Sequence, residues 1–259
     1  FFHFGVPHKF TDYSLKWFVD EIHRLKSAIE EHFNMKISEE KISAAIRLYN
    51  KSRDLIDEFD TLRTADNPLI NGSDALAVTL ASTSMPRQAY VNLLENFISD
   101  IRTSGDTTEG RIRLMLIGSA SDDISFLRMI EGNRAVVVAD TICFGSRSQI
   151  DHVSENGDPL KSLAERYLSK NECPRMYGQF KGRLKMLRDK IKNVKADGVI
   201  LQNIRFCDLH GSENGLFERE LEKDGIPCLK IEREYGPLVE TGRLKMRIDA
   251  LLERIEKRR

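Results

Sequence analysis

The sequence lacks the features that mark membrane proteins and nucleic-acid-binding proteins. No apolar run approaches the roughly 20 residues that a membrane-spanning helix needs. Charge of one sign is not in excess, because 40 basic residues balance 40 acidic residues in a chain of 259 residues. No secretion signal is visible at the start. We therefore expect neither a nucleic-acid partner nor a membrane partner.

Cysteine is scarce, and its spacing excludes several classes of site. The four thiols are Cys143, Cys173, Cys207 and Cys228, and no two of them form a CxxC pair. So few cysteines in a chain of this length exclude the dense disulfide framework of small secreted proteins. We expect reduced thiols in a cytoplasmic protein, each serving as a core residue or as a metal ligand.

Common catalytic and phosphate-binding motifs are also missing. Neither GxGxxG nor GxxxxGK[ST] occurs. No spacing of serine or cysteine with histidine and an acid or amide indicates a nucleophilic triad. His210 follows a predicted strand, but a single loop histidine is more typical of a surface residue. We therefore assign no catalytic residue from spacing.

The sequence changes character near residue 110. Apolar residues recur at helical spacing from residue 11 to residue 104 and predict four helices. We expect Ser73 or Asp74 to cap the start of the third helix. The polar linker RTSGDTTEGR then separates a domain of residues 1–110 from a domain of residues 111–259.

The first residues, FFHFGVP, have the composition of a strand that ends at a proline. No other strand-like run precedes residue 111, so this strand would have no partner within the sequence. We therefore expect residues 1–110 to hold the end of an N-terminal α/β domain, with residues 1–6 as its last strand, followed by the helical region. The rest of that domain would lie outside this sequence.

Four short apolar runs follow residue 110, namely RLMLIG, AVVVAD, GVILQN and IPCLKIE. Such runs suit strands that are buried on both faces of a parallel sheet. Helical patterns lie between them, at residues 121–131, 159–168, 182–192 and 213–223, and a last one spans residues 242–257. The alternation predicts an α/β fold: a four-stranded, parallel, doubly wound (flavodoxin-like) domain preceded by a helical region.

Ligands of open α/β sheets bind beyond the carboxyl ends of the strands, which draws attention to the residues there. The first strand ends in Gly118 and Ser119, where the backbone of a following helix could meet an anion. Asp122 and Asp123 in the next turn would repel a phosphate. A plain strand-to-helix turn is therefore the competing interpretation for Gly118 and Ser119.

The loop CFGSR follows the second strand and is a better candidate for an anion contact. Gly145 and Ser146 can offer backbone N–H groups, and Arg147 offers a planar fork of donors. We expect the Arg147 guanidinium to meet a substrate phosphate or a partner carboxylate. The competing interpretation is a turn with an exposed arginine.

Cys207 has the most suggestive position of the four thiols. It follows the third strand in the stretch GVILQNIRFCDLHG, whereas Cys228 lies inside a strand and is expected to be a core residue. A soft thiolate at the mouth of a sheet favours iron–sulfur or zinc over magnesium. A single cysteine does not decide between a ligand and a structural residue.

Several stretches together resemble the benzoyl-CoA reductase and 2-hydroxyacyl-CoA dehydratase family. They are VVADTICFGSR, DPLKSLAERYL with CPRM, ADGVILQNIRFCDLHG, GIPCLKIEREYG and TGRLKMRIDALLE. The helical part agrees through VPHKFTDYSLKWFVDEI, KISEEKISAAIRLYNKSR and NPLINGSDAL in the same order. The resemblance covers essentially the whole chain.

The resemblance implies a subunit that binds a [4Fe-4S] cluster through three cysteines. It also implies a homologous second subunit that binds a cluster of its own, in a heterodimer or a larger complex. It implies an acyl-CoA substrate, and an ATP-hydrolysing iron–sulfur activator protein that delivers single electrons of low potential. The reaction would be reduction of an aromatic ring, as in benzoyl-CoA reductase, or elimination of water from a 2-hydroxyacyl-CoA through a ketyl radical. A third possibility is a partner or scaffold subunit without a cluster.

The resemblance also assigns a role to one residue. The cysteine of the family's FCD motif ligates the cluster, and here that residue is Cys207. The other two ligands of the family pattern fall in the N-terminal domain. Cys143 and Cys173 are therefore expected near the cleft without ligating iron. Of the two reactions, the motifs CFGSR and FCDLHG favour the benzoyl-CoA reductase type.

Overall fold

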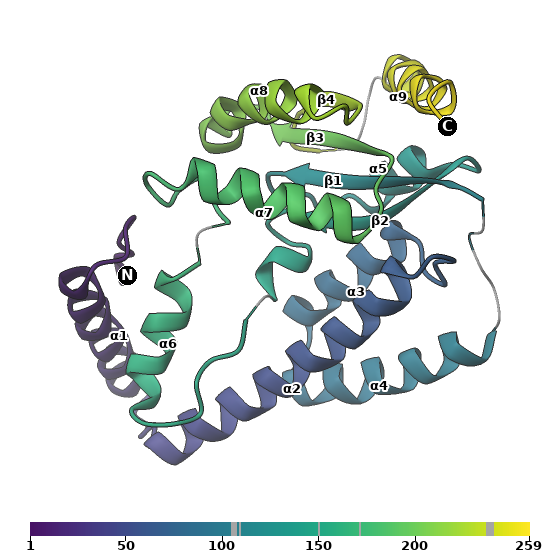
Figure 1. Ribbon diagram of the computed structural model, residues 1–259. Coiled ribbons are helices and arrows are strands. Elements are labelled where there is room, and N and C mark those ends of the chain that lie inside the picture. The colour runs from purple at the N-terminus through teal and green to yellow at the C-terminus, as the bar shows by residue number, and fades with distance from the viewer. Residues whose placement is uncertain (105–107, 109, 150, 171, 237–240) are drawn as a thin grey trace. The chain divides into compact units, whose positions relative to one another are not determined.

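The computed structural model describes residues 1–104, 108, 110–149, 151–170, 172–236 and 241–259 (Figure 1). The chain forms two compact units. The helical unit comprises Phe1–Asp54 and Asp151–Gln179, and the sheet unit comprises Leu55–Ile150 and Phe180–Arg259. None of the helices in the described part of the chain is long and apolar enough to cross a membrane. The predicted domain boundary at residue 110 stays a prediction.

The helical unit is built on α1 (Asp12–His32), the first part of α2 (Glu39–Thr64) and α6 (Pro159–Leu168). Helix α1 lies beside α6 (Figure 1). Their apolar faces meet in a small core of Phe18, Ala164, Leu168 and Met176. In the structure, residues 1–7 pair with no strand. The described residues of this unit contain no strand that could neighbour the one expected at residues 1–6.

The sheet unit takes the second part of α2 together with α3 (Gly72–Ser84) and α4 (Arg87–Ser104). The four helices predicted between residues 11 and 104 are therefore confirmed. Apolar side chains of α2, α3 and α4 pack together in a second core. Its buried members are Ile56, Phe59, Ile70, Ala75, Tyr90, Leu94, Ile98 and Ile101.

The predicted cap of α3 is wrong. Asn71 precedes the helix as N-cap but makes no capping hydrogen bond with its side chain. Instead the buried Glu131 carboxylate accepts the backbone N–H groups of Gly72, at 2.6 Å, and Ser73, at 3.2 Å. Because this carboxylate is distant in sequence, the local pattern around Ser73 could not reveal it.

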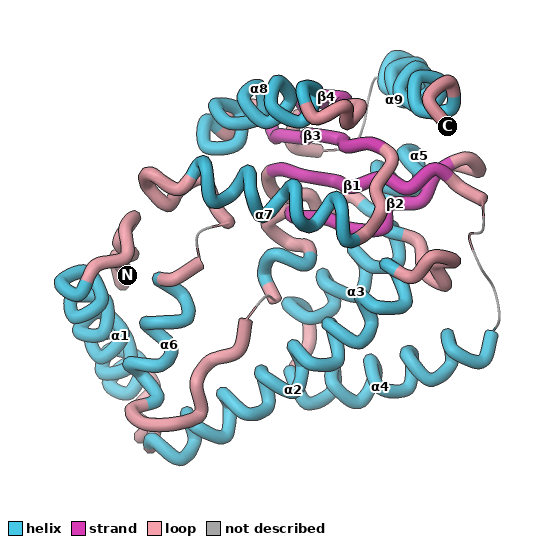
Figure 2. The backbone as a smooth tube through the Cα atoms, viewed as in Figure 1, coloured by secondary structure: helices cyan, strands magenta, loops and turns pink. Residues whose placement is uncertain are grey.

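The sheet is parallel throughout, as predicted. Its strands are β1 (Ile112–Gly118), β2 (Ala135–Thr141), β3 (Gly198–Ile204) and β4 (Cys228–Arg233), in the order β2-β1-β3-β4. Figure 2 shows the strands in magenta. This is the strand order of the first four strands in a flavodoxin-like sheet, so that class is confirmed.

Both faces of the sheet are covered by helices, as a doubly wound fold requires. Alternate strand residues point to opposite faces. One face packs against α3, α5 (Ile124–Glu131) and α9 (Thr241–Glu256). The other face packs against α7 (Phe180–Asn193) and α8 (Asp208–Lys223). Strands that are buried on both faces explain why their sequences are continuous apolar runs.

Candidate functional site

The carboxyl edge of the sheet gathers the loops that follow β1, β2 and β3. Between β1 and β3 the chain reverses its direction of winding, and ligands of such folds bind at this switch point. The two connections of interest are Cys143–Gln149 after β2, which contains the short 3-10 helix η1 (Ser146–Ser148), and the turn from β3 into α8. Together they carry most of the predicted site residues.

Cys207 is the N-cap of α8. Its backbone N–H donates to the carbonyl of Ile204 at 2.9 Å, and its own carbonyl accepts the N–H of Gly211 at 2.8 Å. The half-buried thiol makes no capping hydrogen bond to the helix. The first-turn N–H groups of any helix lack intrahelical acceptors, and the helix dipole favours negative charge there. Cys207 therefore stands where a thiolate or the sulfide of a cluster is electrostatically favoured.

A four-iron cluster is held by several cysteine thiolates, and the described residues supply one at this position. No group of three or more His, Cys, Asp or Glu side chains in the described part of the chain is arranged to hold a metal ion. Cys173 belongs to the helical unit, whereas Cys143 lies after β2 in the sheet unit. The predicted role of Cys207 as a cluster ligand therefore stays a prediction, and it needs further ligands besides those that the described residues offer at this position.

Arg147 is buried and links the two connections. One terminal nitrogen, Nη1, lies 3.2 Å from Nε2 of His210 on α8. The other, Nη2, donates to the sulfur of Cys143. Sequence reasoning placed Arg147 in this loop but expected a contact with a phosphate or a partner carboxylate. The contact between Arg147 and His210 was not predicted, because the two residues are 63 positions apart in the sequence.

His210 is a buried, neutral histidine. Burial, and then the positive charges of Arg147 and Arg183, lower its pKa from 6.5 to about 3. The expectation of a surface histidine was therefore wrong, since only 4% of the residue is exposed. The reason is that α8 begins at Asp208, earlier than the predicted residue 213, and places His210 in its first turn facing the loop after β2.

The loop after β2 is held by a buried charge network centred on Asp140. Its carboxylate accepts from Nη1 of Arg63 at 2.9 Å and from the backbone N–H of Ser146 at 2.9 Å. Lys190 on α7 donates to the carbonyl of Asp140 at 2.8 Å and to Oγ of Ser146 at 3.0 Å. Burial alone would raise the pKa of Asp140, but Arg63 and Lys190 outweigh it and the pKa is lowered. The ionised carboxylate thus anchors the loop that carries Arg147.

Gly145 and Ser146 have structural roles in this loop. A Cβ atom on Gly145 would lie 2.0 Å from Oδ1 of Asp140, so the close approach requires glycine. The N–H of Gly145 donates to the carbonyl of Ile142 at 3.2 Å, and that of Ser146 is taken by Asp140. Both backbone donors that were expected to face an anion therefore have internal acceptors. A substrate contact by either residue stays a prediction.

Gly118 and Ser119 also have structural roles. Gly118 has a φ of 144°, and a Cβ atom on it would lie 1.7 Å from the carbonyl oxygen of Gln202 on β3. Ser119 accepts the N–H of Ile204 on its Oγ at 2.7 Å, while its carbonyl accepts from the Gln202 amide at 2.7 Å. The plain strand-to-helix turn explains both residues, and their binding of substrate stays a prediction.

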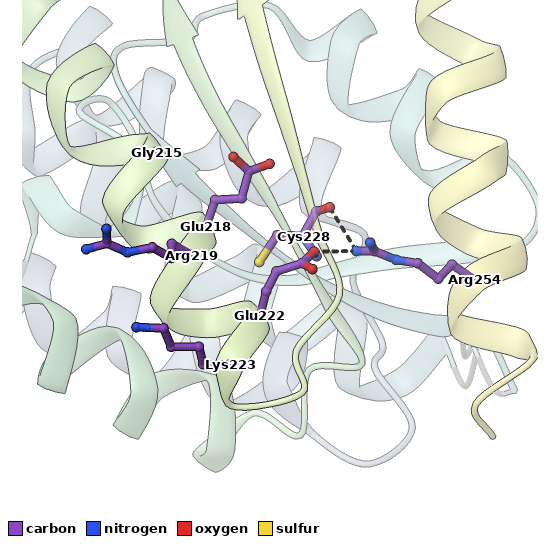
Figure 3. Close-up of a pocket in the computed structure, with 7 residues that line it drawn as sticks. All are labelled: Gly215, Glu218, Arg219, Glu222, Lys223, Cys228 and Arg254. Carbon is purple, nitrogen blue, oxygen red and sulfur yellow. Dashed lines mark hydrogen bonds and ion pairs between the residues drawn. The ribbon is translucent and has the colours of Figure 1, made fainter.

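A pocket of about 640 Å³ lies at the opposite, amino edge of the sheet (Figure 3). It is lined by the C-terminal half of α8, by Cys228 and by Arg254 of α9, whose guanidinium donates to Glu222 and to the Cys228 carbonyl, each at 2.9 Å. Burial, then the nearby Glu222 and Glu218, raise the pKa of Cys228 to about 12. A thiol that stays protonated is a poor metal ligand, and Cys228 is buried in the core as expected.

The sequence profile of the family described as 2-hydroxyglutaryl-CoA dehydratase, D-component, matches residues 1–255. YjiM of Escherichia coli (strain K12), provisionally named a dehydratase subunit, is 30% identical over 90% of this chain and 62% of its own length. The (R)-phenyllactyl-CoA dehydratase beta subunit of Clostridium sporogenes is 25% identical over 80% of this chain and 55% of its own length. One of the benzoyl-CoA reductase subunits of Thauera aromatica is 20% identical over 89% and 61%. The chain thus spans about three fifths of the length of these relatives.

Proposed function

Because the chain belongs to the 2-hydroxyglutaryl-CoA dehydratase D-component family, we propose that it is part of an iron–sulfur subunit of an enzyme that acts on an acyl-CoA thioester. Cys207 carries the proposal. It is half-buried at the carboxyl edge of the sheet, and it is the N-cap of a helix although its sulfur makes no capping hydrogen bond. The dipole of a helix favours negative charge at this end. The thiolate of Cys207 would hold one iron of a [4Fe-4S] cluster.

A bound cluster would supply single electrons of low potential to the substrate. This chain's own residues would hold and shield the cluster. Cys207 provides a ligand, and Arg147 fixes the loop after β2 against the first turn of α8 through His210. The remaining ligands, a homologous second subunit and an ATP-hydrolysing activator protein belong to the proposal, as do phosphate contacts of an acyl-CoA with Arg147.

Two reactions are compatible with this site. The relatives include both dehydratase subunits and a benzoyl-CoA reductase subunit. Reduction of an aromatic ring and elimination of water from a 2-hydroxyacyl-CoA both begin with one electron added to a thioester. The residues proposed for the site would serve either reaction, so a comparison of substrates must separate the two reactions.

The test uses the full-length subunit with its partner, purified without oxygen. Iron and acid-labile sulfide are measured first, because a partner or scaffold subunit without a cluster would contain neither. Benzoyl-CoA is then compared with a panel of 2-hydroxyacyl-CoA thioesters in the presence of activator, reductant and ATP. Turnover of one class identifies the reaction. A subunit that contains no iron, in a complex that remains active, would contradict the proposal.

A further inference from the structure

We draw no further inference here: the strongest candidate, the exposed apolar surface patch of Phe206 and Leu209 where the turn after β3 enters α8, carries nothing, because nothing in the described part of the structure shows what covers it.

Discussion

At the scale of single residues, the turn between β3 and α8 is unusual. Phe206, immediately before Cys207, has a φ of 68° and is 89% exposed. The left-handed conformation costs a residue with a side chain about 1–2 kcal/mol, and such outliers concentrate at functional sites. Exposure of a large aromatic side chain gives no burial energy in return. Because the backbone is strained and the ring is exposed, a substitution at Phe206 can raise the stability of the protein.

Replacement of Phe206 by glycine should stabilise the protein. Glycine adopts positive φ without steric cost, and an exposed ring contributes little to the core, so the free energy of unfolding should rise by up to about 1 kcal/mol. Urea unfolding of this chain measures the change. Phe206→Ala is the matched control, because it removes the ring but keeps the strain. Equal stability of the glycine and alanine variants would show that the strain is not released.

The neutral state of His210 predicts a pH dependence of stability. Its pKa is about 3 in the folded state against 6.5 in the reference state, through burial and the charges of Arg147 and Arg183. The unfolded chain therefore binds a proton on this ring below pH 6.5, whereas the folded chain does not bind one until about pH 3. Stability from this group is full above that window and is lost as the pH falls through it, by about 2 kcal/mol at pH 5.

Urea unfolding at pH 7, 6 and 5 tests this dependence. The loss should be about 2 kcal/mol smaller in His210→Asn than in wild type. Parallel curves for wild type and His210→Asn would contradict the neutral, buried assignment.

At the scale of elements, close approaches between backbones position the site. Gly118 lets β1 end directly against Gln202 of β3, and the Glu131 carboxylate caps α3 while also accepting the N–H of Val137 at 3.0 Å. Both contacts join a helix or a strand to a segment that is distant in the sequence. The Gly118 contact lies at the carboxyl edge, where β1 ends.

Gly118→Ala should be severely destabilising. The added Cβ atom would meet the Gln202 carbonyl at 1.7 Å, and the φ of 144° is one that residues with side chains rarely adopt. We expect a loss of more than about 3 kcal/mol, or failure to fold, by thermal and urea unfolding. Gly215→Ala is the control, because no atom lies within 4 Å of the new Cβ within α8. It should gain about 0.5–1 kcal/mol, and a similar effect of both changes would refute the argument.

At the scale of the whole molecule, two cysteines at opposite edges of one sheet lie in different surroundings. Cys207 lies at the carboxyl edge, half-buried at a helix start, while Cys228 opens β4 at the amino edge with its pKa raised to about 12. A cluster iron needs a deprotonated sulfur, and a metal–thiolate bond is about 2.3 Å long. The raised pKa of Cys228 disfavours such a sulfur at the amino edge.

Cys207→Ala in the full-length subunit should lose iron and all turnover while the α/β sheet still folds. Cys228→Ala should keep its iron and lose only about 1–2 kcal/mol of stability, as for a small buried apolar group. Iron, sulfide and the visible absorption band of each variant are measured without oxygen. Full iron in Cys207→Ala would refute the assignment. Loss of iron only in Cys143→Ala or Cys173→Ala would move the ligand to another thiol.

The sequence by itself determined the architecture, because the information lies in local patterns. Helical spacing between residues 11 and 104 and four doubly buried apolar runs were sufficient for the helices and the parallel sheet. The same patterns located Cys207 at the end of β3, since a strand's carboxyl end is visible where its apolar run stops. The FCD motif added the expectation of a ligand, which iron analysis must still test.

Only the tertiary structure decided what the polar residues at that edge do. Asp140, Arg63 and Lys190 meet from β2, α2 and α7, and the Asp140 carboxylate takes the backbone N–H of Ser146 that the sequence pattern had offered to a substrate. Arg147 and His210 are likewise joined across 63 positions. Hydrogen bonds depend on distances of a few ångströms between atoms, and no local periodicity encodes those distances. The burial of His210 and the charges around it therefore follow from the fold alone.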